Sequence, residues 1–157
     1  MKTIPLTQGK FALIDDADFD LVSKFKWCAQ NRPSGICYAV TRFPGSRKLI
    51  YLHRFVMGEP SGMMVDHINH NGLDNQKENL RSCTCSQNQM NRTGAQMNST
   101  SGARGVSLKK ISSQWQAQIR LNGRLKYLGL FSSIGAASAA YVAANAKYFG
   151  DFGGISR

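Results

Sequence analysis

Long apolar runs are missing from this sequence. No stretch approaches the roughly 20 residues that a membrane-spanning helix requires. The first residues, MKTIPLTQGKFALIDDADFD, contain no apolar core of a signal peptide and become acidic early. We therefore expect an intracellular, cytoplasmic protein.

Cysteine is scarce and poorly spaced for metal binding. The chain has four, Cys28, Cys37, Cys83 and Cys85. One residue separates Cys83 from Cys85, whereas zinc sites usually place two to four residues between paired cysteines. We favour reduced, mostly buried thiols. A four-cysteine zinc site assembled in three dimensions is the alternative.

Acidic residues are also few. The chain has 20 Lys and Arg against 9 Asp and Glu, a formal net charge of +11. Residues 1–60 carry 9 basic and 5 acidic residues, residues 61–92 carry 3 of each, and residues 93–157 carry 8 and 1. This distribution predicts that a polyanion is held by both ends of the chain. The absence of a basic amphipathic helix argues against a membrane surface, and a merely soluble basic protein is the alternative.

The first segment, residues 1–60, is rich in strand patterns. KFALID and CYAVTRF alternate apolar with polar residues, and LIYLHRFVMG is apolar and β-rich. RPSG and FPGSRK are typical of turns. We expect short antiparallel strands, with a little helix near DFDLVSKFKW. The core candidates are Phe25, Trp27, Tyr38 and Phe55.

The second segment, residues 61–92, has little apolar material. MMVDHI and NLRSC predict two short strands, joined by the polar loop NHNGLDNQKE. Thr84 and Gln87 form a capping-box pattern that would start a helix over SQNQMNR. Since this segment has too few apolar residues for a sizeable hydrophobic core, interactions other than apolar packing must order it. Residues 93–103 are rich in Gly, Ser, Thr and Asn and predict a linker.

The third segment, residues 104–157, predicts a sheet and one helix. WQAQIRL alternates in period two, and the following NG is a strong two-residue hairpin turn. RGVSLKK predicts a third strand, and SSIGAASAAYVAANAKYFG a helix capped by Ser132 or Ser133 and ended by Gly150. The fold class is α+β: a small N-terminal β-rich segment, a strand–loop–strand–helix unit and a C-terminal three-stranded antiparallel sheet packed on one helix.

The pair Asp66-His67 suits phosphodiester hydrolysis. That reaction needs a base for water, a stabilised leaving oxygen and an offset for the phosphate charge. Histidine titrates near neutrality, and a hard divalent cation prefers oxygen ligands. Because neighbours in a strand point to opposite faces, both side chains can serve one site only where the strand is distorted or ends. The loop from Asn69 would end it.

The spacing of this region is specific. Asp66-His67, Asn79 twelve residues on and Asn88 nine further resemble the HNH nuclease motif of the ββα-metal type. The flanking LHRFVMG, VDHINHNGLDN, ENLR and SQNQMNR are similar to phage and intron-encoded homing endonucleases. The resemblance implies His67 as general base, with Asn79 accepting from its ring, and Asp66 and Asn88 as metal ligands. Two oxygen ligands and no nitrogen favour Mg²⁺ or Mn²⁺.

Four other charged or titratable residues lie near this motif. His70 lies in the loop, where a solvated or DNA-grazing side chain is expected. His53 is on an apolar strand, where a buried core or interface histidine is more common than a ligand. Arg81 would meet a phosphate near the metal or remain a surface charge. Arg92, one helical turn after Asn88, would follow the DNA backbone.

Residues 100–150 resemble a second family. Their RGV, W-x-A-x-I, LG-x-F and the Ala-rich helix ending in FG are similar to the apetala-two / ethylene-response-factor DNA-binding domain of plant regulators. The resemblance implies a sheet lying in the major groove, backed by the helix, with double-stranded DNA as partner. The implied outward DNA-binding residues are Arg104, Lys109, Lys110, Gln116, Gln118, Arg120, Arg124 and Lys126. Trp115, Ala117, Ile119 and Leu121 fall on the opposite, core face.

The sequence therefore predicts a metal-dependent DNA endonuclease of the homing type. One HNH site cuts one strand, so a monomer is expected to nick and a homodimer or two events would be needed for a double-strand break. The alternative from another class is a sequence-specific DNA-binding regulator with an inactive HNH unit.

Overall fold

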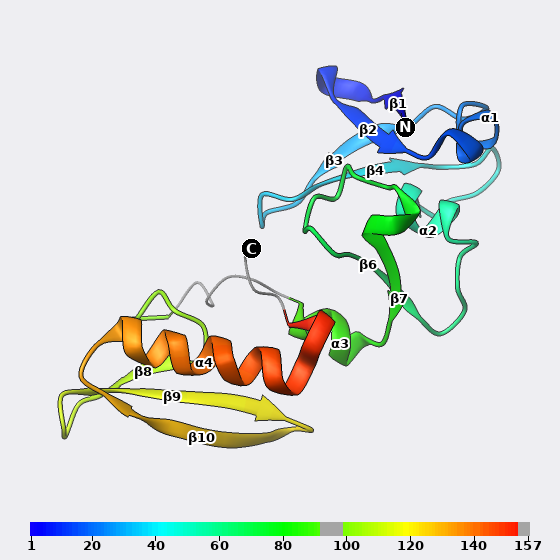
Figure 1. Ribbon diagram of the computed structural model, residues 1–157. Coiled ribbons are helices and arrows are strands. Elements are labelled where there is room, and N and C mark those ends of the chain that lie inside the picture. Colours follow the sequence, from blue (N-terminus) through cyan, green and yellow to red (C-terminus); the bar gives the residue numbers. More distant parts are fainter. Residues whose placement is uncertain (92–98, 154–157) are drawn as a thin grey trace. The chain divides into compact units, whose positions relative to one another are not determined.

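The computed structural model describes residues 1–91 and 99–153. It has two compact units, Met1–Cys85 and Ser86–Arg157. Several small sheets and short helices make up the first, and a three-stranded sheet with one long helix makes up the second (Figure 1). The predicted α+β class is confirmed. Arg92 and the first part of the predicted linker, residues 93–98, lie outside the described residues, and the predicted domain boundaries stay predictions.

The N-terminal part of the first unit consists of short antiparallel strands, as predicted. Its elements are β1 (Lys2–Pro5), β2 (Phe11–Ile14), α1 (Phe19–Val22), β3 (Cys28–Asn31), β4 (Cys37–Thr41), β5 (Ile50–Tyr51) and α2 (Leu52–Val56), with 3-10 turns η1 (Thr7–Gly9) and η2 (Asp16–Asp18). β1 pairs with β2, and β3, β4 and β5 form one sheet in that order. The apolar residues of these strands close over one core, in which Trp27 is 3% exposed and donates its ring N–H to the Val22 carbonyl.

One expected strand is mostly helix. The apolar stretch LIYLHRFVMG predicted a strand, but β5 holds only Ile50–Tyr51 and the chain then turns into α2. A helical turn places Leu52, Phe55 and Val56 on one side, and all three pack in the same core. Short apolar runs fit strand and helix periods equally well, so tertiary packing decides between them. The consequence is that His53, on α2, is buried.

The predicted strand, loop, strand and helix of residues 61–92 are present. β6 (Met64–His67) pairs antiparallel with β7 (Leu80–Cys83), and α3 (Cys85–Met90) follows β7 in the chain. The 3-10 turn η3 (Lys77–Asn79) ends the loop between the strands.

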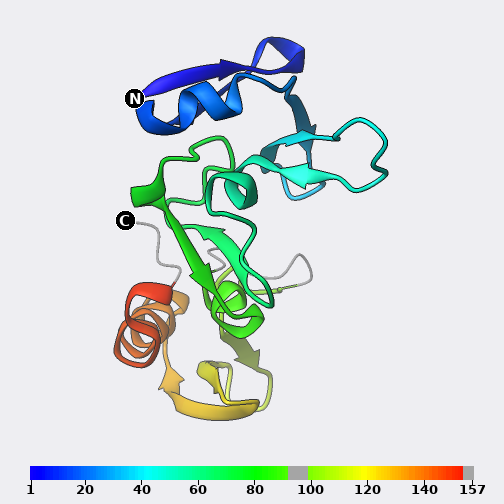
Figure 2. The ribbon, with the colours of Figure 1, turned by 90° about the vertical axis from the view of Figure 1, so that its right-hand side faces the viewer.

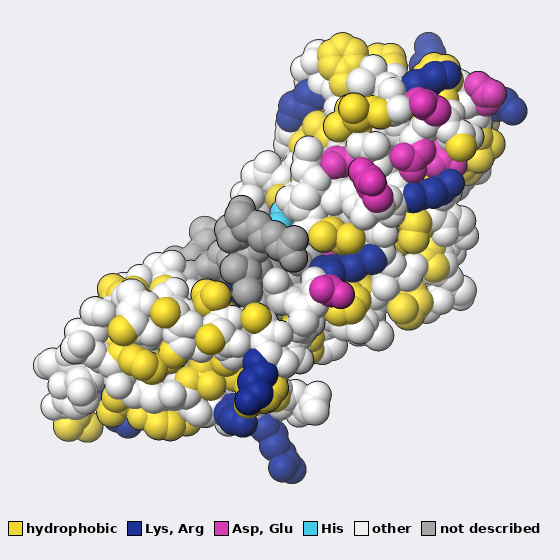
Figure 3. Space-filling model, viewed as in Figure 1, with side chains coloured by type: hydrophobic (Ala, Val, Ile, Leu, Met, Phe, Trp, Pro, Cys, Tyr) yellow, Lys and Arg dark blue, Asp and Glu magenta, His cyan; other side chains and the backbone are white. Residues whose placement is uncertain are grey.

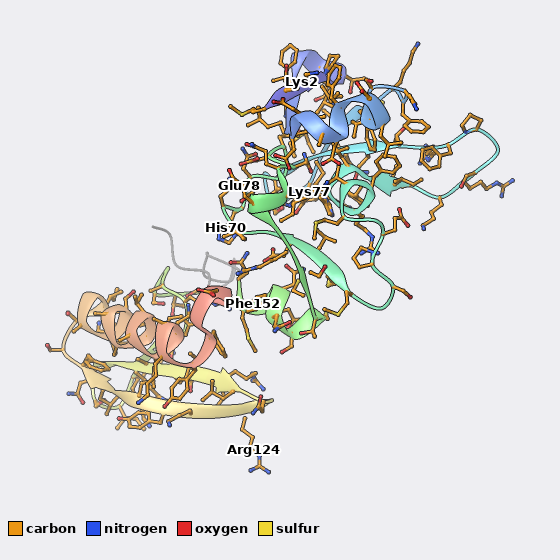
Figure 4. All side chains as sticks on the ribbon, turned by 45° about the vertical axis from the view of Figure 1, so that its right-hand side comes forward. Lys2, His70, Lys77, Glu78, Arg124 and Phe152 are labelled. Carbon is orange, nitrogen blue, oxygen red and sulfur yellow. The ribbon has the colours of Figure 1, made fainter. Side chains whose placement is uncertain are left out.

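The N-terminal hairpin holds this loop in place. Leu13 of β2 donates its N–H to the Leu73 carbonyl and accepts from the Asn75 N–H, both at 2.8 Å. The Lys77 N–H donates to the Asp15 carboxylate at 2.8 Å. Lys77 lies on the same stretch of chain as His70 (Figure 4). The first segment therefore braces the loop between β6 and β7.

The second unit follows the predicted hairpin, third strand and helix closely. β8 (Val106–Lys109), β9 (Gln114–Leu121) and β10 (Arg124–Phe131) form a sheet in the order β10-β9-β8, and α4 (Ile134–Phe149) covers one face (Figures 1 and 2). Asn122 and Gly123 have φ of 47° and 79°, as a type I′ hairpin turn requires. The Ser133 side chain caps α4 by accepting from the Ala136 N–H. The 3-10 turn η4 (Gly150–Phe152) follows.

Small residues bring α4 close to the sheet. Ala137 is fully buried against Val106 and Ala117, and Tyr141 and Ala144 pack on Ile119. Among the described residues no helix is long and apolar enough to cross a membrane.

Gly72 gives a test of how closely the loop packs on the sheet. A Cβ at this position would lie 2.8 Å from the Tyr38 ring and closer still to the Cys37 carbonyl. We predict that Gly72→Ala lowers the free energy of unfolding by about 1–3 kcal/mol, because the backbone of β4 or the loop must shift. Urea denaturation measures this loss.

Gly135→Ala is the matched control. Its added methyl meets only the Ser133 hydroxyl, at 4.0 Å, and it lies in the first turn of α4. Stability should be unchanged or slightly raised there. Equal losses in the two variants would contradict the close packing of the loop.

Candidate active site

Asp66 and His67 are the last two residues of β6, and both are buried, at 9% and 5% exposure. The strand ends there as the sequence predicted. The Ile68 N–H still donates to the Asn79 carbonyl, in register with the β6–β7 pairing, and the chain then leaves the strand before His70, which has φ of 63°. Two polar side chains therefore sit at a buried strand end, where their hydrogen-bond partners decide what they can do.

The Asp66 carboxylate is paired with Arg81. These residues lie directly opposite each other in the β6–β7 register. Arg81 donates from Nε at 3.2 Å and from Nη2 at 3.0 Å, both to Oδ2, and both side chains are largely buried. A buried carboxylate paired in this way is fixed in orientation. The predicted contact of Arg81 with a DNA phosphate stays a prediction.

His67 has a hydrogen-bond partner that the sequence did not single out. Its Nε2 lies 3.4 Å from Oδ1 of Asn75, a side chain with no exposed surface. An amide oxygen only accepts, so this assignment puts the ring proton on Nε2 and the basic lone pair on Nδ1. No spacing rule identifies the place of Asn75 at the ring, because the loop's tertiary fold brings it there.

Asn79 closes the loop at its base. Its Oδ1 accepts from the Asn69 N–H at 3.0 Å, and its Nδ2 donates to the Asp74 carbonyl at 2.8 Å. The predicted bond from the His67 ring to Asn79 stays a prediction, beside the observed bond to Asn75.

The remaining amides of the loop bind its own backbone. Asn69 Oδ1 accepts from the Asn71 N–H, and Asn71 Oδ1 accepts from the Leu73 N–H. The Asn69 Nδ2 donates to the Asp74 carboxylate at 2.7 Å. These bonds shape the loop, and they account for the order of a unit with little apolar core.

Aromatic rings enclose the His67 imidazole. The His53 ring meets it edge to face with 4.8 Å between centroids, and the Tyr38 ring lies 5.8 Å away. Tyr51 in turn lies 5.4 Å from His53. His53 is 8% exposed, as the buried-histidine interpretation predicted, although on a helix, and its Nδ1 has no hydrogen-bond partner among the described residues.

Burial sets the protonation of both rings. It lowers the pKa of His67, against the opposing effects of the Asn75 hydrogen bond and the Asp66 charge. It also lowers the pKa of His53 to about 3, with smaller contributions from His67 and Arg54. Both imidazoles are therefore neutral at pH 7, and a neutral imidazole is the form that accepts a proton.

The donor set fits a hard divalent cation. The Asp66 carboxylate offers oxygen, which Mg²⁺ and Mn²⁺ prefer. Asn88 is half-buried on α3, and its position relative to Asp66 stays a prediction. Within residues 1–91 and 99–153 no group of three or more His, Cys, Asp or Glu is arranged to hold a metal. A cation here would therefore complete its shell with water and phosphate oxygen.

The zinc alternative for the cysteines is wrong. All four are free thiols that form no metal-binding group in the described part of the chain. The expectation of mostly buried thiols is also wrong, since only Cys83 is buried and Cys28 and Cys85 are exposed. Cys28 and Cys85 lie at the first positions of β3 and α3, where side chains are easily left at the surface.

The residues predicted to bind DNA fall into two groups in the second unit. Gln116, Gln118 and Arg120 lie on β9 with parity opposite to the buried Ala117 and Ile119, so they face away from α4, as predicted. Lys109 ends β8, and Lys110 lies in the turn after it.

Three other residues of this set lie elsewhere than predicted. Arg104 precedes β8 and donates to the Gln89 and Met90 carbonyls. Arg124 and Lys126 pair with core-facing residues of β9, so they fall on the α4 side of the sheet. Lys126 donates from Nζ to the Tyr148 hydroxyl of α4 at 2.7 Å, whereas Arg124 extends away from the hairpin end (Figure 4). The predicted outward positions on β10 are therefore wrong, and DNA contact by these residues stays a prediction.

Residues 51–90 match the family model described as HNH endonuclease. The match includes His53, Asp66, His67, Asn79 and Asn88.

A protein of Acanthamoeba polyphaga mimivirus, named an uncharacterized HNH endonuclease, is 32% identical to this chain over 123 residues. The aligned part is 74% of this chain and 58% of that protein, so the chain spans somewhat more than half the relative's length. No solved structure matches the chain. The resemblance of residues 100–150 to the apetala-two domain stays a prediction.

The buried His53 gives a pH prediction. Its pKa of about 3 in the folded chain lies below the unfolded value of about 6.5. Its contribution to stability is therefore full above pH 6.5 and is lost as the pH falls toward 3, by at most about 1.4 kcal/mol per pH unit. We predict that His53→Phe, which retains a ring, makes the acid loss of unfolding free energy shallower.

Urea denaturation from pH 7 to pH 4 measures the slope. His70→Asn is the control, because His70 lies partly exposed in the loop and Asn tolerates its positive φ. An unchanged slope in His53→Phe, or an equal change in the His70 variant, would contradict the burial of a neutral His53.

Proposed function

We propose that this chain is a metal-dependent DNA endonuclease of the homing HNH type, which hydrolyses phosphodiester bonds and nicks as a monomer. The carrying observation is a buried neutral imidazole, His67, next to the buried carboxylate of Asp66, at a strand end within the residues that match the HNH endonuclease model. A base and a hard-metal ligand placed side by side are what the reaction needs.

His67 acts as general base in this proposal. The Asn75 carbonyl holds the ring through Nε2–H, so Nδ1 takes a proton from water as the water attacks the phosphorus. The Tyr38 and His53 rings exclude bulk solvent from two sides and keep the imidazole neutral. Asn79 is a positioning residue, because it fixes the loop that carries Asn75.

Asp66 and Asn88 would hold the cation, which we expect to be Mg²⁺ or Mn²⁺. When bound, the ion supplies positive charge for the scissile phosphate and the leaving 3′ oxygen. Arg81 orients the Asp66 carboxylate and adds a second positive charge beside it. The bond between phosphorus and the 3′ oxygen breaks, leaving a 5′-phosphate and a 3′-hydroxyl.

The second unit would hold the duplex. Residues 93–157 carry 8 basic residues and 1 acidic residue, whereas acidic side chains gather on the first unit (Figure 3). This charge complements a phosphate backbone. One catalytic site cuts one strand, so double-strand breaks would require a homodimer or two events.

A second candidate is a DNA-binding regulator with an inactive HNH unit. The observation that favours it is the ion pair of Asp66 with Arg81, which occupies Oδ2 of the carboxylate that a cation would use. A cation must then share this carboxylate with a guanidinium. The two candidates differ in whether metal ions produce cleavage.

Supercoiled-plasmid cleavage separates the two candidates. The full chain with Mg²⁺ or Mn²⁺ should convert supercoiled plasmid to open circles, and EDTA should prevent it. His67→Ala should lower the nicking rate about 10²- to 10⁴-fold, the usual contribution of a general base, with DNA binding retained. His70→Asn, the matched histidine control, should nick at the wild-type rate.

DNA binding without metal-dependent nicking by the wild-type chain would contradict the endonuclease and support the regulator. Nicking that survives His67→Ala would contradict the assigned base.

A further inference from the structure

The outer face of the β8–β9–β10 sheet, which points away from α4, carries two unlike rows of side chains. Gln116, Gln118 and Arg120 form the middle row, on β9. Directly opposite them on β10 are Leu130, Tyr127 and Leu125, in that order. Cross-strand partners point to the same face of a sheet, so an apolar row runs beside an amide row.

The apolar row is open to solvent. Leu125 is 55% exposed, Tyr127 58% and Leu130 37%. Single exposed apolar residues are ordinary, but three large ones in a line on one strand are typical of a contact surface. The α4 side of the same sheet holds the two core clusters of this unit, so the exposed row is not part of its core.

A β-bulge keeps this row in line. The register shifts between Tyr127 and Gly129, which turns Leu128 into the core and returns Leu130 to the outer face. Gly129 has φ of 144°, a conformation that other residues rarely adopt. The row is therefore built into the backbone of β10.

The amide row is oriented as well. Gln116 donates from Nε2 to Oε1 of Gln118 at 3.3 Å. That bond leaves the Gln118 Nε2 as a donor and the Gln116 Oε1 as an acceptor. An adenine edge in the major groove offers the complementary pair, an acceptor at N7 and a donor at N6.

The positive charge of this unit restricts which partners can bind to the outer face of the sheet. No Asp or Glu occurs from residue 79 to residue 150 of the sequence. Lys109 lies at the β8 edge of the face, and Arg120 is tied to the hairpin turn by a 2.9 Å bond to the Gly123 carbonyl. Basic residues flank the face at its edge and at its end, where the phosphates of a bound duplex would lie.

We propose that this outer face reads A·T base pairs in the major groove of duplex DNA. Gln116 and Gln118 together hydrogen-bond one adenine edge, and Leu125, Tyr127 and Leu130 contact the 5-methyl groups of thymines. An amide row beside an apolar row matches the two chemical marks that A·T pairs show in that groove, whereas guanine is matched best by arginine or lysine. This inference rests on the proposed function only in taking DNA as the substrate.

The test is selection of binding sites from a randomised duplex library by the full chain in EDTA, where cleavage plays no part. The selected sites should share a run of A·T pairs. Replacing its thymines by deoxyuridine, which lacks only the 5-methyl group, should weaken binding about fourfold per contacted methyl.

Substitutions assign the effect to the two rows. Tyr127→Ser and Leu125→Ser, both at exposed sites, should each reduce the preference for thymine over deoxyuridine duplexes by about fourfold, the effect of one contacted methyl. Gln118→Ala should reduce discrimination against G·C at one position by roughly 5- to 150-fold. Val142→Ser, at a 40% exposed site on α4, is the control and should keep both preferences. Far-ultraviolet circular dichroism checks that each variant is folded.

The outcomes separate this inference from the proposed function. DNA binding and metal-dependent nicking with no A·T preference, or with no deoxyuridine effect, would overturn the inference alone. An A·T preference without nicking would overturn the endonuclease and support the inference. Failure to bind any duplex would overturn both.

Discussion

Burial of the Asp66-His67 pair without a large apolar core beneath it is the constraint on which the site depends. A buried carboxylate and imidazole are costly unless each polar atom is paired. Arg81 pairs the carboxylate, Asn75 pairs the ring, and the other loop amides satisfy the backbone that carries Asn75. The amide-rich loop is thus the ordering device of the unit, and the N-terminal hairpin holds it from outside.

The same burial prepares the chemistry. Removing His67 from water favours its neutral form, and the amide oxygen at Nε2 directs the basic nitrogen the other way. His53 adds a second ring that stays uncharged, so the imidazole is not opposed by a neighbouring positive ring. The ion pair of Asp66 with Arg81 opposes cation binding, because it stabilises the site without a metal and places a positive charge near the position a cation would take.

Local patterns in the sequence were enough to predict much of the fold. The NG turn, the alternation of β9 and the alanine stripe of α4 each act within a few residues, and each predicted element is present. The His67 neighbourhood was harder. Asn75 reaches the ring only because Leu13, far away in the chain, fixes the loop, and local spacing carries no information about that contact.

The other corrections have the same origin. The short α2 replaces an expected strand because helical spacing buries Leu52 and Phe55 together. Lys126 lies directly opposite Ile119 in the β9–β10 register. Because Ile119 is buried in the core on the α4 side of the sheet, Lys126 points to that side as well. In both places the local sequence is compatible with two structures, and tertiary packing determines which of them forms.

The tautomer of His67 tests the central claim most directly. A long-range ¹H–¹⁵N correlation spectrum of the metal-free chain at pH 7, assigned with His67→Gln, reports which ring nitrogen carries the proton. We expect a neutral ring with the proton on Nε2 in the wild-type chain, and a different protonation pattern in Asn75→Ala. A ring protonated on both nitrogens, or a neutral ring with its proton on Nδ1, would contradict this expectation.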